Sequence, residues 1–168
     1  MPDIGFKDRH VEPILSGEKP ITLRRAWKLD RTPDLGARLG LVSGWRTPQR
    51  RRFGSAVIVA RATVWIGEEG LVAFTDWRTA GFVPERLQHV GAALSKIPEL
   101  ARIRERDQEA RDAAAASWAA GSHVLAILDG FPDFPAMRAF HAAHRAEGAD
   151  PVIRRELIGF GGVSREFG

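Results

Sequence analysis

One segment limits the possible folds of this chain more than any other: the nearly continuous apolar run "SAVIVARATVWIG" at residues 55–67. It is rich in valine, isoleucine and threonine, whose branched side chains favour strands over helices. Residues 57, 58 and 59 are all apolar, which indicates that this strand is largely buried. The chain is therefore expected to form a sheet with other elements packed against it.

Shorter segments predict the strands and the first turn around this run. Strands are expected at residues 4–6, 21–25, 38–45 and 152–160. A brief helical turn is expected after residue 7, with Asp8 as its N-cap and Gly17 as its end. We expect the first and last strands to pair.

The middle of the chain is expected to be helical, because apolar residues recur there at spacings of three and four. These residues are Leu87, Val90, Leu94, Ile97 and Ala101. Pro98 interrupts the stripe, which predicts a second helix starting near Ser95 and ending at Gly121. A last helix is expected near Pro135, with Asp133 as its cap. The elements together predict one α+β domain over 1–168, a small β-barrel with helices packed on it.

Size and composition limit the class of protein. A chain of 168 residues can bury its own core without metal or disulfide support. It contains no cysteine, which excludes disulfides, thiol catalysis and cysteine-based metal sites. The first ten residues carry charges where a signal peptide needs an apolar run, and no segment approaches about 18 consecutive apolar residues. We expect a cytoplasmic protein with no membrane-spanning segment.

The positive charge of the chain is mostly arginine. Of 25 basic residues only four are lysine, and the net charge is +4. Arginine suits contacts with phosphate, although a coding bias towards alanine, arginine and glycine explains the excess equally well. Residues 43–61 hold five arginines and no acid. There Trp45 stands beside Arg46, Arg50 and Arg51, a pairing that can stack a base and hold its phosphates, or simply pack on its own hairpin.

The segment "SGEKPITLRR" at 16–25 is a candidate site. In its strand Ile21 and Leu23 alternate with Thr22 and Arg24, so the hydroxyl and the guanidinium share one face. Lys19 lies just upstream, where a turn can direct its amine towards that face. The pattern fits a small polar site for an anionic or amide-bearing ligand, but the spacing alone favours a solvent-facing strand with no task, because Thr and Arg are common on exposed strand faces.

A longer segment resembles a known family. "FKDRHVEPILSGEKPITLRR" is similar to the opening of the ASCH domain, a relative of the PUA RNA-binding fold, which carries an apolar run followed by a glycine, a lysine, a threonine and an arginine. The matching residues are Ile14, Leu15, Gly17, Lys19, Thr22 and Arg24. "LDGFPDFPAMRAF" resembles the acidic–Gly–Phe motif of the family, and "VIRRELIGF" its closing strand. The resemblance covers residues 4–67 and 124–160 and makes about 68–123 a helical insertion.

The resemblance implies a PUA-like β-barrel whose basic cleft binds RNA or a nucleotide, with Arg24, Arg25, Trp45 and the hairpin arginines at the cleft. Some compact members of the family are amidohydrolases that remove the acyl group from N4-acetylcytidine, and another branch is ribonuclease-like. Carried over to this chain, their catalytic trio becomes Lys19, Thr22 and Asp129. Asp129 is one methylene shorter than the glutamate of those members.

Three functions follow from these residues. The chain is an RNA- or nucleotide-binding module, a hydrolase in which Lys19 activates Thr22, or a protein-interaction module that uses the insertion helices. An adjacent Asp129 raises the pKa of the lysine whereas nearby arginines lower it, so sequence leaves the base role open. We expect neither a metal nor another cofactor, because His141 and His144 have the spacing of metal ligands but no third ligand is in evidence.

Overall fold

The computed structural model describes residues 1–25, 33–68, 70–95, 121–144 and 152–166. Within these ranges the fold is a mixed α+β arrangement, as predicted. Its strands are β1 (Asp3–Phe6), β2 (Ile21–Arg24), β3 (Arg38–Ser43), β4 (Arg51–Ile66), β5 (Leu71–Thr79) and β6 (Ile153–Arg165). Its helices are a 3-10 turn (Asp8–His10), α1 (Val11–Leu15), α2 (Glu85–Ser95), a helix at 121–128 and α5 (Phe134–Ala143).

The strands form one six-stranded sheet that does not close. Its order is β1-β3-β4-β6-β2, and β5 pairs with a further part of β4. The pairing of β4 with β6 shifts register at 55/57 and again at 58/60, and such bulges bend a sheet. β1 and β2 are the two ends of the order and are not paired with each other, so a barrel is not shown.

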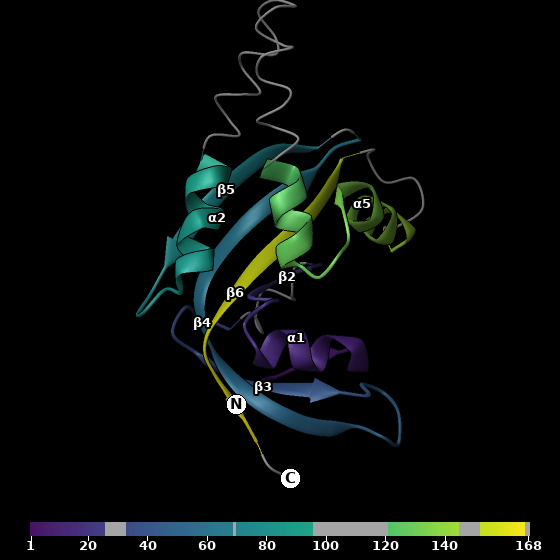
Figure 1. The fold of residues 1–168 in the computed structure, drawn as a ribbon, viewed down its shortest axis with the longest axis vertical. Coiled ribbons are helices and arrows are strands. Elements are labelled where there is room, and N and C mark those ends of the chain that lie inside the picture. The colour runs from purple at the N-terminus through teal and green to yellow at the C-terminus, as the bar shows by residue number, and fades with distance from the viewer. Residues whose placement is uncertain (26–32, 69, 96–120, 145–151, 167–168) are drawn as a thin grey trace, which may run out of the picture.

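The long apolar run lies at the centre of the sheet and is buried on both faces. Ile58 of β4 belongs to a core with α1, β1 and β3, whereas the next residue, Val59, belongs to a second core with α2, the 121–128 helix and α5. Leu157 and Ile158 of β6 divide between the same two cores. Figure 1 shows α1 beside the lower half of the sheet and the other three helices along its upper half.

Several sequence predictions are wrong in detail. The insertion at 68–123 is not helical throughout, because "LVAFTDWRT" forms β5; its valine, threonine and aromatic residues favour a strand that pairs with the long β4. The first and last strands do not pair: β1 is parallel to β3, and β6 lies between β4 and β2. Asp8 lies inside the 3-10 turn, whose N-cap is Lys7, and Gly121 lies within a helix rather than ending one.

The second middle helix, over 96–120, lies outside the described residues. The last helix agrees with the prediction: the carboxylate of Asp133 accepts a hydrogen bond from the backbone N–H of Ala136 at 2.8 Å and caps α5. None of the helices in the described ranges combines the length and the apolar character that a bilayer span requires.

Candidate functional site

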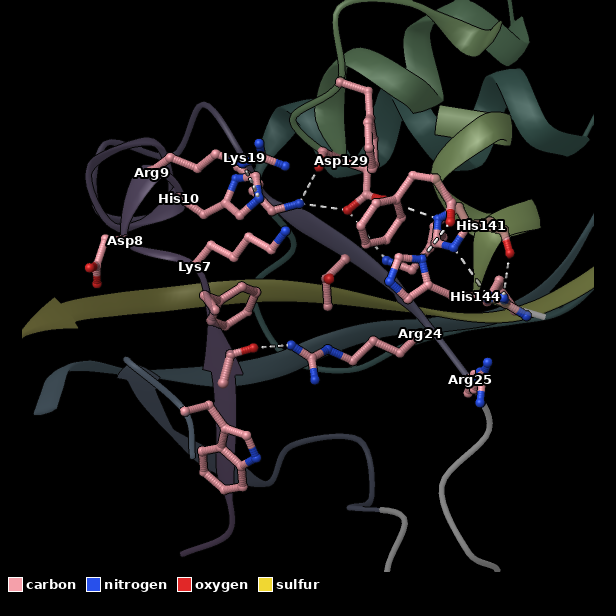
Figure 2. A pocket seen from close by; sticks show the side chains of 18 of the residues that line it. Lys7, Asp8, Arg9, His10, Lys19, Arg24, Arg25, Asp129, His141 and His144 are labelled. Carbon is pink, nitrogen blue, oxygen red and sulfur yellow. Dashed lines mark hydrogen bonds and ion pairs between the residues drawn. The ribbon is translucent and has the colours of Figure 1, made fainter. Parts of the chain in front are cut away.

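A cleft of about 970 Å³ opens where the two end strands of the sheet approach each other. Its walls come from β1, the 3-10 turn, β2, the loop between β3 and β4, the turn after the 121–128 helix, α5 and Arg155 of β6. Arg24 of β2 donates a hydrogen bond from Nη2 to the backbone oxygen of Gly5 in β1, so a side chain links the two unpaired strands (Figure 2). The cleft is therefore a consequence of the incomplete closure of the sheet.

The innermost pair is Lys19 and Asp129, which are 110 positions apart in the chain. The ammonium of Lys19 lies 2.5 Å from Oδ1 of Asp129 and also donates to its backbone oxygen. Each residue is only 3% exposed. The N–H of Leu23 approaches the same Oδ1 at 3.4 Å, and Gly130, at a φ of 85°, makes the left-handed turn that ends the preceding helix. Two distant sequence motifs thus meet at one point.

Burial changes the acidity of this lysine. The pKa of Lys19 is lowered from its ordinary value, because desolvation penalises the ammonium and the charges of Arg24 and Arg9 add to that effect. The charge and hydrogen bond of Asp129 oppose the shift without reversing it. Burial and the neighbouring positive charges therefore outweigh Asp129 in their effect on the pKa of Lys19.

A histidine and an arginine continue the polar chain beyond Asp129. Oδ2 of Asp129 lies 3.8 Å from Nε2 of His141, and Nδ1 of His141 accepts a hydrogen bond from Nε of Arg155 at 3.1 Å. Because a guanidinium can only donate, the neutral imidazole carries its proton on Nε2, facing the carboxylate. That Nε2 is buried and has no hydrogen-bond partner among the described residues.

Thr22 and Arg24 present unused hydrogen-bonding groups. Thr22 is 6% exposed and lines the cleft, and its hydroxyl has no partner in the described ranges. Arg24 lies over the ring of Phe6, 5.1 Å from its centroid, and its buried Nε is unpartnered within the same ranges. Burial lowers the pKa of Arg24 to about 10, which leaves it charged at neutral pH.

The rim of the cleft is positive. Among the described residues that line it, six are lysine or arginine and three are aspartate. Lys7 and Arg9 are exposed there, and beside them the pKa of His10 is lowered to about 4 by burial and by the charges of Lys19 and Arg9. His10 is therefore neutral at physiological pH.

Aromatic rings form another part of the wall. The rings of Phe131 and Phe140 are 5.3 Å apart, and the exposed ring of His144 lies 4.4 Å from that of Phe140. All three residues line the cleft. Such surfaces can support a planar base.

The structure brings some predicted nucleic-acid residues to the cleft and leaves others outside it. Arg24, Arg25 and Trp45 line it, whereas Arg46, Arg50 and Arg51 do not. Trp45 packs on Gly5, and the guanidinium of Arg50 lies 4.8 Å from the centre of its ring while also pairing with Asp3 at 2.6 Å. Arg51 donates to the hydroxyl of Ser43 at 3.3 Å. Trp45 and Arg50 are therefore already engaged with their own surroundings.

Sequence reasoning did not assign His10, Arg155, Phe131 or Phe140 to the site. A signal for Arg155 existed, because it shares a strand face with Ile153 and Leu157, both of which are buried. Within the described ranges, no group of three or more histidine, aspartate or glutamate side chains is placed to hold a metal ion.

Comparisons with protein-family models, with curated proteins and with solved structures found no match for this chain.

Proposed function

We propose that the cleft binds a nucleotide, either free or within a single-stranded part of an RNA, as in an ASCH-type, PUA-like domain. The observation that carries the proposal is the composition of the cleft: its described lining holds six basic residues against three aspartates, together with aromatic rings. Cationic side chains hold phosphates, and aromatic faces stack unpaired bases. The similarity of the Lys19–Arg24 segment to the ASCH motif supports the same proposal.

The residues divide between the two tasks. The exposed Lys7 and Arg9 at the rim meet phosphates from solvent, and Arg25 adds a third charge on the cleft wall. Phe140 and His144 offer a stacking surface, because their rings are already nearly parallel, with an angle of 34° between their planes. Trp45 borders the other end of the cleft and is 43% exposed.

Equilibrium binding of short single-stranded RNAs at several salt concentrations tests this proposal. Removal of one phosphate-binding cation, as in Lys7→Ala, should weaken binding and make the slope of log K against log salt shallower by about 0.7. Arg78→Ala is the matched control, because Arg78 is exposed on β5 and does not line the cleft. Equal effects of Lys7→Ala and Arg78→Ala on RNA binding would contradict the proposal that the cleft is the binding site.

A second candidate function is hydrolysis of an acyl group from a modified nucleoside, and a specific observation favours it. A lysine with a lowered pKa, an unpartnered threonine hydroxyl and a buried carboxylate line the same cleft. In this reaction Lys19 takes the hydroxyl proton as Thr22 Oγ1 attacks the amide carbonyl. The C–N bond then breaks as a proton reaches the leaving nitrogen, and water hydrolyses the resulting ester. Arg24 is suited to stabilise the oxyanion.

Turnover of N4-acetylcytidine tests the second candidate. Thr22→Val keeps the shape of the side chain and removes only the hydroxyl, so binding of the nucleoside should persist while turnover is lost. Because that hydroxyl has no partner in the described chain and lines the cleft, the fold should lose little stability. Undiminished turnover by Thr22→Val would exclude this mechanism.

A further inference from the structure

The floor of the cleft holds more positive charge than its own residues neutralise. Lys19, Arg24 and Arg155 line it, and Asp129 is the carboxylate that lies among them. Three cations and one anion leave an excess of two positive charges in a region shielded from water. Two other carboxylates near these elements are already paired: Asp3 of β1 with Arg50 and Arg52 at 2.6 Å, and Glu156, opposite Arg24 on β6, with Arg61 at 3.2 Å. Shielded charges are costly unless an opposite charge accompanies them.

The pKa values of the three cationic groups are consistent with this excess of positive charge. Among the described residues, Asp129 is the anion that raises the pKa of Lys19 and of Arg24, and the pKa of each nevertheless remains lowered by burial. The pKa of Arg155 is lowered as well, by burial and by Arg25. An added anion at this floor would oppose all three shifts.

Among the described residues of the floor, the guanidinium nitrogen without a hydrogen-bond partner belongs to Arg24 rather than to Arg155. All three nitrogens of the Arg155 guanidinium donate to His141 or to the backbone of Arg154. Arg24 uses Nη2 on Gly5, while its buried Nε has no partner in the described chain. The hydroxyl of Thr22, which has no partner within the described part of the chain, comes from the same strand, two residues earlier. Arg155 therefore contributes charge, and Arg24 and Thr22 contribute contacts.

We infer that the floor of the cleft is a binding site for the terminal phosphate of a nucleotide, held by Lys19, Arg24 and Thr22. A terminal phosphate carries between one and two negative charges at neutral pH and several acceptor oxygens, whereas an internal phosphodiester carries one charge. The excess of two positive charges therefore matches the end of a nucleotide better than the middle of an RNA. This inference rests on the proposed nucleotide-binding function and specifies which chemical group of the nucleotide the floor binds.

Cytidine 5′-monophosphate, its phosphate methyl ester and cytidine form a matched series with about two, one and no charges. Calorimetric titration should show that the monophosphate binds about tenfold or more tightly than the ester, because the second charge strengthens its hydrogen bonds to the guanidinium. Inorganic phosphate should also bind. Binding of phosphate should also raise the pKa of His10, which NMR of the imidazole can follow. That pKa is lowered by burial and by the charges of Lys19, Arg9 and Lys7, and it is raised by Asp129. A bound anion would act in the same direction as Asp129.

Substitutions locate the site. Arg24→Gln should remove the preference for the monophosphate over cytidine, and Arg24→Lys should restore part of the preference because it restores the charge. Arg78→Gln, which changes the charge equally on β5, should have no effect. If Arg24→Gln does not fold, the wild-type series and the His10 titration still decide the question.

The outcomes separate this inference from the function on which it rests. Equal binding of cytidine and its monophosphate, with an unchanged His10 pKa in phosphate, overturns the phosphate site and leaves nucleotide binding standing. Binding of inorganic phosphate without any binding of nucleotides or RNA supports an anion site and overturns the proposed function. Absence of all binding overturns both.

Discussion

Replacement of Asp129 by asparagine is a direct test of the polar centre of this fold. Asparagine keeps the shape of the side chain, and its amide oxygen can still accept a hydrogen bond from Lys19. The negative charge beside the 3% exposed ammonium is lost. The variant therefore measures the value of that charge to a buried lysine.

Removal of one partner from a buried ion pair costs about 3–5 kcal/mol, because the other charge remains buried and unpaired. Here the retained hydrogen bond and the ability of Lys19 to lose its proton place the expected loss at the lower end, about 3 kcal/mol at pH 7. For a domain of this size that loss lowers the melting temperature by about 6–12 °C. The loss should shrink as pH rises, because the folded variant then holds Lys19 as a neutral amine.

Urea unfolding of the wild type, Asp129→Asn, Lys19→Met and the double variant Lys19→Met/Asp129→Leu measures these terms. The double variant should recover most of the loss, because an apolar pair of similar volume leaves no unpaired charge. A loss below about 1 kcal/mol for Asp129→Asn, or a double variant no more stable than Asp129→Asn, would refute the reasoning.

Three further predictions follow from single contacts. Gly130→Ala and Gly17→Ala should each cost about 1–2 kcal/mol in unfolding experiments, because the two glycines have φ values of 85° and 80°. Only Gly130→Ala should also weaken ligand binding, because its Cβ would lie 3.3 Å from the Lys19 side chain. A binding loss in both variants would contradict this. Between pH 6.5 and about 4 the unfolded chain binds a proton at His10 that the folded chain does not, so the free energy of unfolding should fall as pH falls. In urea titrations His10→Gln should make this dependence on pH weaker. An unchanged pH dependence would contradict the lowered pKa of His10. Asp133→Ala should lower the free energy of unfolding by about 1 kcal/mol through loss of the α5 cap, as measured by thermal unfolding. An unchanged stability would show that this cap does not stabilise α5.

Local patterns in the sequence were sufficient for much of the fold. The apolar run of β4 required burial on both faces, and the structure packs a separate core against each face. Asp133 before Pro135 marked the start of α5, because an aspartate cap and an early proline are local signals. Such features depend on a few neighbouring residues, and a pattern records them directly.

The site depended on a different kind of information. No spacing rule relates Lys19 to Asp129 across 110 positions, and only the family resemblance suggested the pair that the structure then places at 2.5 Å. The placement of Arg50 on Trp45 was equally open, because an arginine beside a tryptophan can meet a ligand or its own hairpin. Long-range contacts and the choice among nearby partners are decided by tertiary packing.

The strand β5 shows a third limit. Its sequence contains strand-forming residues, yet the assignment of 68–123 to a helical insertion concealed them. Its pairing partner is the part of β4 from Ala60 to Ile66, which the predicted 55–67 strand already included. The pairing of a second strand with that part of β4 is a tertiary contact, which a local sequence window does not report.

Backbone amide NMR during titration with cytidine 5′-monophosphate tests the central claim, that one basic cleft between the end strands binds a nucleotide. The predicted result is a saturable set of shifts in the segments that line the cleft, at residues 5–10, 19–25 and 129–131. Shifts confined to the outer hairpin at 48–52, or to α2, would contradict the account.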